Sequence, residues 1–402
     1  MLDVRNDDRW GGVSGGTVEV QAVLWRSRGV QALVGVTALG FASYFLTLAS
    51  LPTYAVAGGA SAATAGVVTA VFLVVTILVQ TVVPALTVRF GVGPVFAAGL
   101  LALGVPAPLY VLDDGVGWIS LLSAVRGAGF AVITVLGATL SVRVAPPERR
   151  GESIGLYGLA IALPNMAAIP AGVALVLDGH VGWLAWLSAS PVLGLFFLPM
   201  LLRSVTTREE RGAKGNARTA VRAALAPSLV LFVVTTAGGG LVTFLPIERP
   251  DGRLATVALL LWGLFGALTR WRAGVLADRL GTGLLLPLAV LVGAAGLAVT
   301  AVGLWTASAW VLVGAAVFGA GFGAVQNLTL LRAFSRAGDQ GTTAASALWN
   351  ASFDAGTACG ALLLGFVFGA VGLPWTFVFS AVALAILLPL AQAAARPAPA
   401  RP

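Results

Sequence analysis

The sequence predicts an all-α membrane protein with twelve transmembrane helices arranged as two six-helix halves. Composition is the first reason: of 402 residues, 58% are hydrophobic and 10% are charged, and the mean hydropathy is +0.95. Soluble globular domains of this length carry far more charge. The second reason is that apolar runs of about 20 residues, long enough to cross a bilayer as helices, fill most of the chain.

The twelve apolar segments follow one another with short polar interruptions. In chain order, the predicted helices span residues 31–53, 62–84, 93–112, 117–142, 152–176, 181–202, 225–247, 254–273, 282–303, 307–331, 341–369 and 373–393. The longest polar stretch in the interior of the chain separates the sixth helix from the seventh. It therefore predicts the boundary between the two halves.

These segments divide the chain into five parts. They are a tail at 1–28, a first six-helix half at 29–202, a linker at 203–224, a second six-helix half at 225–393 and a tail at 394–402. The first tail has no apolar segment behind a basic start, so no cleaved signal peptide is predicted.

The distribution of charge predicts the orientation of the helices. All but three of the 24 basic residues lie in the tails, the linker and the loops on one side of the membrane. Two of the three, Arg249 and Arg253, lie on the other side, and Arg126 lies within a helix. Because basic residues are retained on the cytoplasmic side, both tails and the linker are predicted to be cytoplasmic, in a plasma membrane protein. Tryptophans near the opposite helix ends agree with this: Trp118, Trp183, Trp186, Trp305, Trp310 and Trp375.

The two halves repeat one another in sequence. Gly127-Ala-Gly-Phe130 recurs as Gly319-Ala-Gly-Phe322, an offset of 192 residues, and Arg89-Phe-Gly91 aligns with Arg279-Leu-Gly281 at an offset of 190. Repeated six-helix halves of this kind place a binding site near the middle of the membrane, between the halves.

A short charged segment, Gly274-Val-Leu-Ala-Asp278-Arg279-Leu-Gly281, is predicted to form a tight turn between two helices. The pattern resembles the loop motif of the major facilitator superfamily of secondary transporters, and the chain from about residue 30 resembles that fold. The resemblance implies a conformational latch formed by Gly274, Asp278, Arg279 and Gly281. We expect Asp278 to meet a helix N-terminus and cytoplasmic arginines such as Arg332 or Arg336. The alternative is a hairpin that serves topology only.

One cation is predicted at membrane depth. Arg126, in Arg126-Gly-Ala-Gly-Phe-Ala131, resembles the arginine of the helix-4 motif of drug–proton antiporters, with Gly129 three residues later. A charge inside the bilayer is costly and faces a cavity or a partner. The resemblance implies a role in proton coupling, and a buried structural ion pair is the alternative.

One acid is predicted at membrane depth. Asp354 lies near the middle of the helix at 341–369, and Asn350, four residues earlier, shares its face. We expect Asp354 to take up and release the coupling proton, with Arg126 either paired to it or holding polar contacts in its own half. A structural hydrogen bond to a neighbouring helix is the alternative.

Other polar and aromatic side chains within the predicted helices are candidates for the solute cavity. They are Tyr44, Thr47, Thr235, Thr236, Trp262, Gln326, Asn327, Trp349 and Asn350. For each of them, ordinary packing between helices is the alternative.

These features predict a secondary transporter that works by alternating access. The resemblance implies proton-coupled export, of the drug or arabinose-efflux type, and the sparse polar lining suits a small amphipathic or moderately apolar molecule. Uptake of a nutrient by symport and a non-transporting receptor or scaffold are the alternatives. No catalytic residue, cofactor or metal site is predicted, because the chain has no phosphate-binding loop, one histidine and one cysteine. The expected partners are the solute, a proton and the lipid bilayer. Nucleic acid is not expected, and the protein is predicted to be a monomer.

Overall fold

The computed structural model describes residues 24–60, 62–205, 217–248 and 253–396. Within these ranges the regular elements are α-helices and short 3-10 helices, as predicted. Most of the predicted tails, at 1–23 and 397–402, and the middle of the predicted linker, at 206–216, lie outside the described residues.

The first half contains the first six predicted spans. Its elements are α2 (Arg28–Leu48), α3 (Ser50–Ala57), α4 (Ala62–Phe90), α5 (Val92–Gly104), η1 (Ala107–Leu112), α6 (Val116–Arg143), η2 (Pro147–Arg149), α7 (Arg150–Leu177), α8 (Val181–Leu187), η3 (Ser190–Leu193) and α9 (Gly194–Ser204). Short elements continue or precede the long helices, so that six spans result.

The second half contains the remaining spans. Its elements are α10 (Ala217–Glu248), α11 (Arg253–Leu280), α12 (Leu285–Trp305), α13 (Ser308–Ala337), η4 (Asp339–Gly341), α14 (Thr342–Val371), α15 (Leu373–Ile386) and α16 (Leu388–Ala395). Ten segments of the described chain are long and apolar enough to cross a membrane, and eleven if the bent pair α15 and α16 forms one span. With α11, which has 28 residues, the described chain accounts for all twelve predicted spans.

The predicted boundaries that differ most from the structure are the start of α10 and the end of α11. α10 begins at Ala217 instead of 225, and α11 continues to Leu280, so that Gly274 to Leu280 is helix and not a turn. Residues 217–224 consist mainly of Ala and Arg, and residues 274–280 include two Leu, one Ala and one Arg. These residue types favour helix whether or not lipid surrounds them. α11 ends where Gly281 adopts φ +75°, a conformation that side chains with a Cβ rarely adopt.

The repeated Gly-Ala-Gly-Phe motif occupies the same place in each half. A Cβ on Gly127 would lie 2.5 Å from the carbonyl oxygen of Phe72 in α4, and one on Gly129 would lie 2.4 Å from the backbone nitrogen of Leu103 in α5. In the second half, Gly319 and Gly321 make corresponding close approaches to α11 and α12. The motif therefore repeats because it lets the central helix of each half pack closely against two neighbours.

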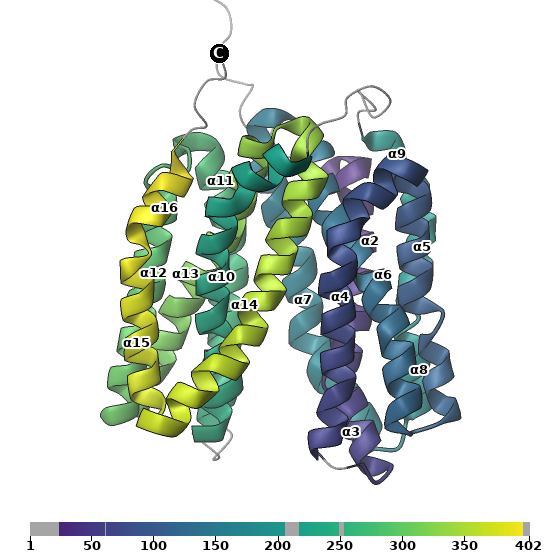
Figure 1. The fold of residues 1–402 in the computed structure, drawn as a ribbon, viewed down its shortest axis with the longest axis horizontal. Coiled ribbons are helices and arrows are strands. Elements are labelled where there is room, and N and C mark those ends of the chain that lie inside the picture. Colours follow the sequence, from purple (N-terminus) through teal and green to yellow (C-terminus); the bar gives the residue numbers. More distant parts are fainter. Residues whose placement is uncertain (1–23, 61, 206–216, 249–252, 397–402) are drawn as a thin grey trace, which may run out of the picture.

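The two halves lie side by side. Figure 1 shows α2–α9 on the right and α10–α16 on the left, with α14 at the border between them. We call the end of the bundle where α9 ends and α10 begins the linker end; the C-terminal helix α16 ends there too. From the linker end, α14 slants away from α4 toward the opposite end (Figure 1). One hydrophobic core extends across the border, because Phe334, Ala345 and Trp349 of the second half belong to the core of the first.

Candidate functional site

Asp278 joins the halves at the linker end. Its two carboxylate oxygens accept hydrogen bonds from the backbone nitrogens of Gly151 and Glu152, each at 2.9 Å, at the first turn of α7. Those N–H groups have no partner within their own helix, and the positive end of the helix dipole favours a carboxylate there. A Cβ on Gly274, one turn earlier in α11, would lie 2.0 Å from the carbonyl oxygen of Gly151. The glycine thus allows the crossing that brings Asp278 to α7.

The arginines expected beside Asp278 lie elsewhere. Arg332 and Arg336 donate hydrogen bonds to backbone carbonyls at the end of α16, among them Ala394 at 3.3 Å from Arg332 and Ala393 at 2.6 Å from Arg336. Carbonyls at a helix C-terminus lack partners in their own helix and attract cations. This part of the prediction was therefore wrong. Arg279 is exposed.

Further polar contacts join the halves near the same end. Arg150 forms an ion pair with Asp339 at 3.1 Å, and Arg143 donates to the Thr342 hydroxyl at 3.1 Å. Deeper in the bundle, Ser346 donates to the carbonyl of Val135 at 2.7 Å. Along α7, residues 153–158 are buried whereas 161–167 are partly or fully exposed; along α14, residues 344–347 are buried whereas 351–355 are partly exposed. These contacts form a seal between the halves on the linker side of the bundle.

Asp354 lies at the inner edge of this seal. Gln80 of α4 donates a hydrogen bond to its carboxylate at 2.8 Å and lies 3.4 Å from the Thr134 hydroxyl of α6. Asn350, one turn toward the linker end, donates to Ser346 in its own helix and to the carbonyl of Thr134 across the border. Asp354 is partly exposed, whereas Gln80 is fully buried. The acid is therefore held by the opposite half while part of its side chain stays exposed.

Gln80 and Thr134 were not among the predicted site residues. Gln80 is the one side-chain amide in the helix predicted at 62–84, and that isolated amide was the available signal. Its partner could not be predicted, since it is 274 residues away in the chain.

Arg126 makes its polar contacts within the first half. Of the two predicted arrangements, pairing with Asp354 or contacts in its own half, the structure has the second. Its guanidinium donates to the Leu103 carbonyl at 2.9 Å, to the Tyr110 hydroxyl at 3.3 Å, and to the Ser43 hydroxyl and carbonyl at 2.8 and 3.2 Å. It also lies 5.4 Å from the centre of the Tyr110 ring. The side chain is fully buried and links α2, α5, η1 and α6. The structure does not bring it to Asp354.

A second cation is buried within the helix bundle, and it was not among the predicted site residues. Arg270 of α11 is 7% exposed and donates to the side-chain oxygen of Gln326 at 2.8 Å. The charge distribution had grouped Arg270 with the basic residues of the following loop, although position 270 falls within the predicted helix at 254–273. In the structure ten residues of helix follow it, which places it about 15 Å from the helix end.

Four predicted cavity residues lie at the seal. Gln326 accepts from Arg270, and Asn327 donates to the carbonyls of Arg270 and Gly151 at 2.9 and 3.2 Å. Trp349 donates to Thr329 at 3.0 Å, and Asn350 contacts Thr134 as described. Their side chains are at most 8% exposed. In this conformation they close the linker side.

The other five predicted cavity residues lie within their own halves. Tyr44 stacks on Phe130, with ring centres 4.2 Å apart, and the ring of Trp262 lies 5.1 Å from that of Phe322. The hydroxyls of Thr47, Thr235 and Thr236 bind carbonyls of their own helices. Whether these residues contact solute remains a prediction.

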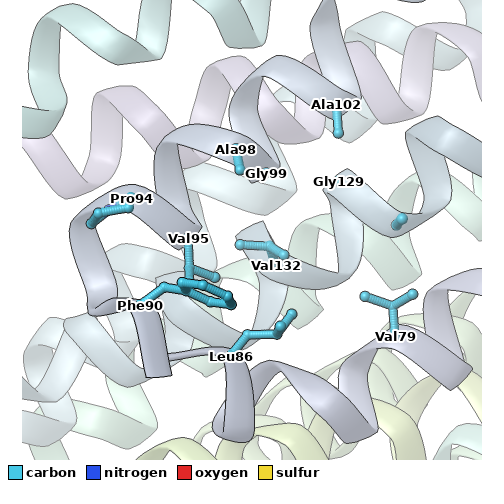
Figure 2. Close-up of a pocket in the computed structure, with 11 residues that line it drawn as sticks. Val79, Leu86, Phe90, Pro94, Val95, Ala98, Gly99, Ala102, Gly129 and Val132 are labelled. Atoms are coloured by element: carbon cyan, nitrogen blue, oxygen red, sulfur yellow. The ribbon is translucent and has the colours of Figure 1, made fainter. Parts of the chain in front are cut away.

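An apolar groove lies apart from all of these residues. It has a volume of about 400 Å³ and lies between α4, α5 and α6 (Figure 2). Its lining includes Val79, Leu86, Phe90, Val95, Ala102 and Val132. Because the groove is formed within the first half alone, relative motion of the halves does not carry it from one side of the membrane to the other.

Comparisons with known proteins agree with this architecture. A family model described as Major Facilitator Superfamily matches residues 33–347, well over half of the chain. Similar solved structures include the E. coli fucose:proton symporter FucP (TM-score 0.70, 15% identity, 91% of this chain and 98% of that chain). The human organic anion transporter MFSD10 is similar at TM-score 0.71 and 17% identity, over 91% of this chain and 99% of that chain. The proton:xylose symporter XylE is similar at TM-score 0.70 and 15% identity, over 91% and 95%. At these identities the solved structures show a shared fold alone, whereas the family match shows that the chain belongs to the major facilitator superfamily, a family of multi-pass membrane transporters and not of enzymes.

Proposed function

We propose that this transporter exports a small amphipathic or moderately apolar molecule in exchange for protons by alternating access. The observation that carries the proposal is the hydrogen bond between Asp354 of the second half and Gln80 of the first. A coupling acid must interact differently with the two conformations of the transporter, because a proton shifts an equilibrium only by its differential affinity. A bond between the halves satisfies that requirement.

The bond depends on the charge of Asp354. An ionised carboxylate accepts a stronger hydrogen bond from an amide than a protonated carboxyl does. Ionised Asp354 therefore favours the conformation that is sealed at the linker end, and protonation weakens the bond to Gln80 and favours separation of the halves there. Uptake of a proton from the far side would thus promote opening at the linker end, as antiport requires.

The remaining features support alternating access with the linker end in the cytoplasm. The charge bias of the loops favours that orientation. Under it, the seal formed by Asp278, Ser346 and Asn350 closes the cytoplasmic side, and the partly exposed Asp354 would receive water from outside. The partners in this proposal are the solute, a proton and the lipid bilayer, and a single chain contains both halves of the site.

Uptake by symport is the second candidate. Two of the similar structures carry the titles fucose:proton and proton:xylose symporter, and the Asp354–Gln80 bond would serve symport as well. The similarity of Arg126 and the glycines after it to the antiporter motif favours export. A non-transporting receptor or scaffold would not need Asp354 at all.

Transport in inside-out vesicles tests the proposal. We expect wild-type vesicles to accumulate at least one member of a panel of amphipathic compounds when a pH gradient is imposed. Asp354→Asn mimics the protonated side chain, so it should abolish accumulation against a gradient while leaving substrate binding and exchange measurable. Asp178→Asn, a change of an exposed acid at the end of α7, is the matched control.

The outcomes separate the candidates. If Asp354→Asn vesicles still drive uphill transport on the pH gradient, Asp354 is structural and proton coupling through it is wrong. If wild-type protein accumulates a compound only in right-side-out vesicles, the direction is uptake.

A further inference from the structure

Arg270 has two donors without acceptors. Its Nη1 donates to Gln326, but Nε and Nη2 are buried and have no hydrogen-bond partner among the residues that the structure describes. No ion pair of Arg270 is found in that part of the chain either. A buried guanidinium without a counter-charge is costly, so a residue of this kind has a partner in some state of the protein.

The internal repeat shows which residues of the first half correspond to Arg270 and Gln326. At the offsets between the halves, Gln80 of α4 corresponds to Arg270 of α11, and Thr134 of α6 corresponds to Gln326 of α13. Each pair is in contact: Gln80 with Thr134 at 3.4 Å, and Arg270 with Gln326 at 2.8 Å. The two halves thus hold equivalent polar pairs at the border.

The two halves differ at the position that corresponds to Asp354. Asp354 of α14 supplies a carboxylate to Gln80 from the opposite half. The residue of α7 at the corresponding position is Ala162, which offers no charge to Arg270. One of the two equivalent sites therefore combines a neutral amide with a carboxylate, whereas the other has a cation and, at the position that corresponds to the carboxylate, an alanine.

The free donors have the geometry of a carboxylate site. Nε–H and Nη2–H lie on the same edge of a guanidinium and point in parallel, so together they match the two oxygens of one carboxylate. The bond from Nη1 to Gln326 holds the plane of the group and leaves this edge available. Gly158 of α7 covers the same side chain: a Cβ there would lie 2.4 Å from Nε of Arg270.

We propose that Arg270, oriented by Gln326, binds the carboxylate of a monoanionic amphipathic solute through Nε and Nη2 once α7 has moved away from α11. This inference rests on the proposed transport function and specifies its substrate class. In the present conformation α7 covers the guanidinium, and separation of the halves at the linker end uncovers it. The solute then takes, beside Arg270, the position that Asp354 takes beside Gln80.

Binding measurements on the full-length protein in lipid nanodiscs test the proposal. The probes are three acids, benzoate, phenylacetate and octanoate, each compared with its uncharged amide. We expect at least one acid to bind and raise the thermal unfolding temperature more than its amide. Arg270→Gln should weaken binding of that acid about ten- to a hundredfold, because two hydrogen bonds from a charged group are lost, and leave amide binding unchanged.

Two further variants keep the test independent of folding. Arg270→Lys keeps the positive charge but removes the two-donor edge, so it should fold as wild type and bind the acid about tenfold more weakly. Arg272→Gln removes an exposed arginine from the same helix and should bind as wild type. A merely structural Arg270 would change stability without changing the preference for acid over amide.

The proposal is overturned if no acid binds better than its amide, or if Arg270→Gln binds the acids as wild type does. Its failure is distinct from failure of the proposed transport function. If Arg270→Gln vesicles still accumulate uncharged compounds on a pH gradient, the anion site is wrong and proton-coupled export stands. If wild-type vesicles accumulate no compound on a gradient, the export proposal fails whatever the binding result.

Discussion

Substitution of Gly274 by alanine should open the linker end. A Cβ at this position would lie 2.0 Å from the carbonyl oxygen of Gly151, whereas ordinary contact begins at 3.4 Å. α7 and α11 must therefore separate by the difference, about 1.4 Å, because the opposing atom belongs to the backbone and cannot turn aside. Nothing comparable applies at Gly263 of the same helix, where a Cβ would meet no atom within 4 Å.

The separation would break the contacts of Asp278. Its hydrogen bonds to Gly151 and Glu152 are 2.9 Å long, and an increase of that size takes them beyond hydrogen-bonding distance. A partly buried contact between a carboxylate and a helix N-terminus is worth on the order of 1–2 kcal/mol. Loss of about 1.4 kcal/mol raises the population that is open at the linker end about tenfold.

Cysteine accessibility measures that population. Ser346 is fully buried at the border and hydrogen-bonded to Val135 of the other half. In a Cys359→Ala background, Ser346→Cys should react with a maleimide added from the linker side about ten times faster when Gly274→Ala is also present. The rate is proportional to the open fraction when opening and closing are fast.

Gly263→Ala serves as the matched control and should leave the labelling rate unchanged. If Gly274→Ala leaves the rate unchanged at normal expression, the glycine crossing does not hold the halves together. The reasoning is also refuted if both alanine variants raise the rate equally, because the effect would then come from helix stiffening and not from the contact with α7.

The remaining predictions concern the latch, the buried arginine and the orientation. Asp278→Asn keeps the size of the side chain but weakens both bonds to α7, so transport should fall while expression stays normal; unchanged transport would leave the segment with a topological role only. Arg126→Ala removes four hydrogen bonds in the first half and should destabilise the protein by about 3 kcal/mol or more, measured by thermal unfolding in nanodiscs; a wild-type unfolding temperature would contradict its structural role. Cysteines at Lys214 and Arg253, in a background without Cys359, should be labelled from inside and outside the cell respectively. Labelling of position 214 from outside would overturn the orientation.

The sequence alone determined the number and order of the helices. Each predicted span matches a described helix or helix pair, since hydropathy is a local property and a bilayer accepts only segments of sufficient apolar length. The repeat of Gly-Ala-Gly-Phe aligned the two halves, and the structure adds that the motif lets one helix of each half pack closely against two neighbours. The ends of α10 and α11 were missed, because helix propensity and not hydropathy sets how far a helix continues beyond the bilayer.

Only the tertiary structure decided which polar groups meet. Asp278 was expected to face a helix N-terminus, but the sequence did not say which one. The placement of the halves brings it to α7, 127 residues away in the chain, and brings Arg332 and Arg336 to α16 instead. The same holds for Asp354, whose partner Gln80 comes from the other half, and for Arg270, which the charge distribution had grouped with a loop and which binds Gln326. Hydropathy specifies the depth of a residue along its own helix. Its neighbours across the border depend on the rotation and crossing of helices far apart in the chain, which follow from packing of the whole bundle.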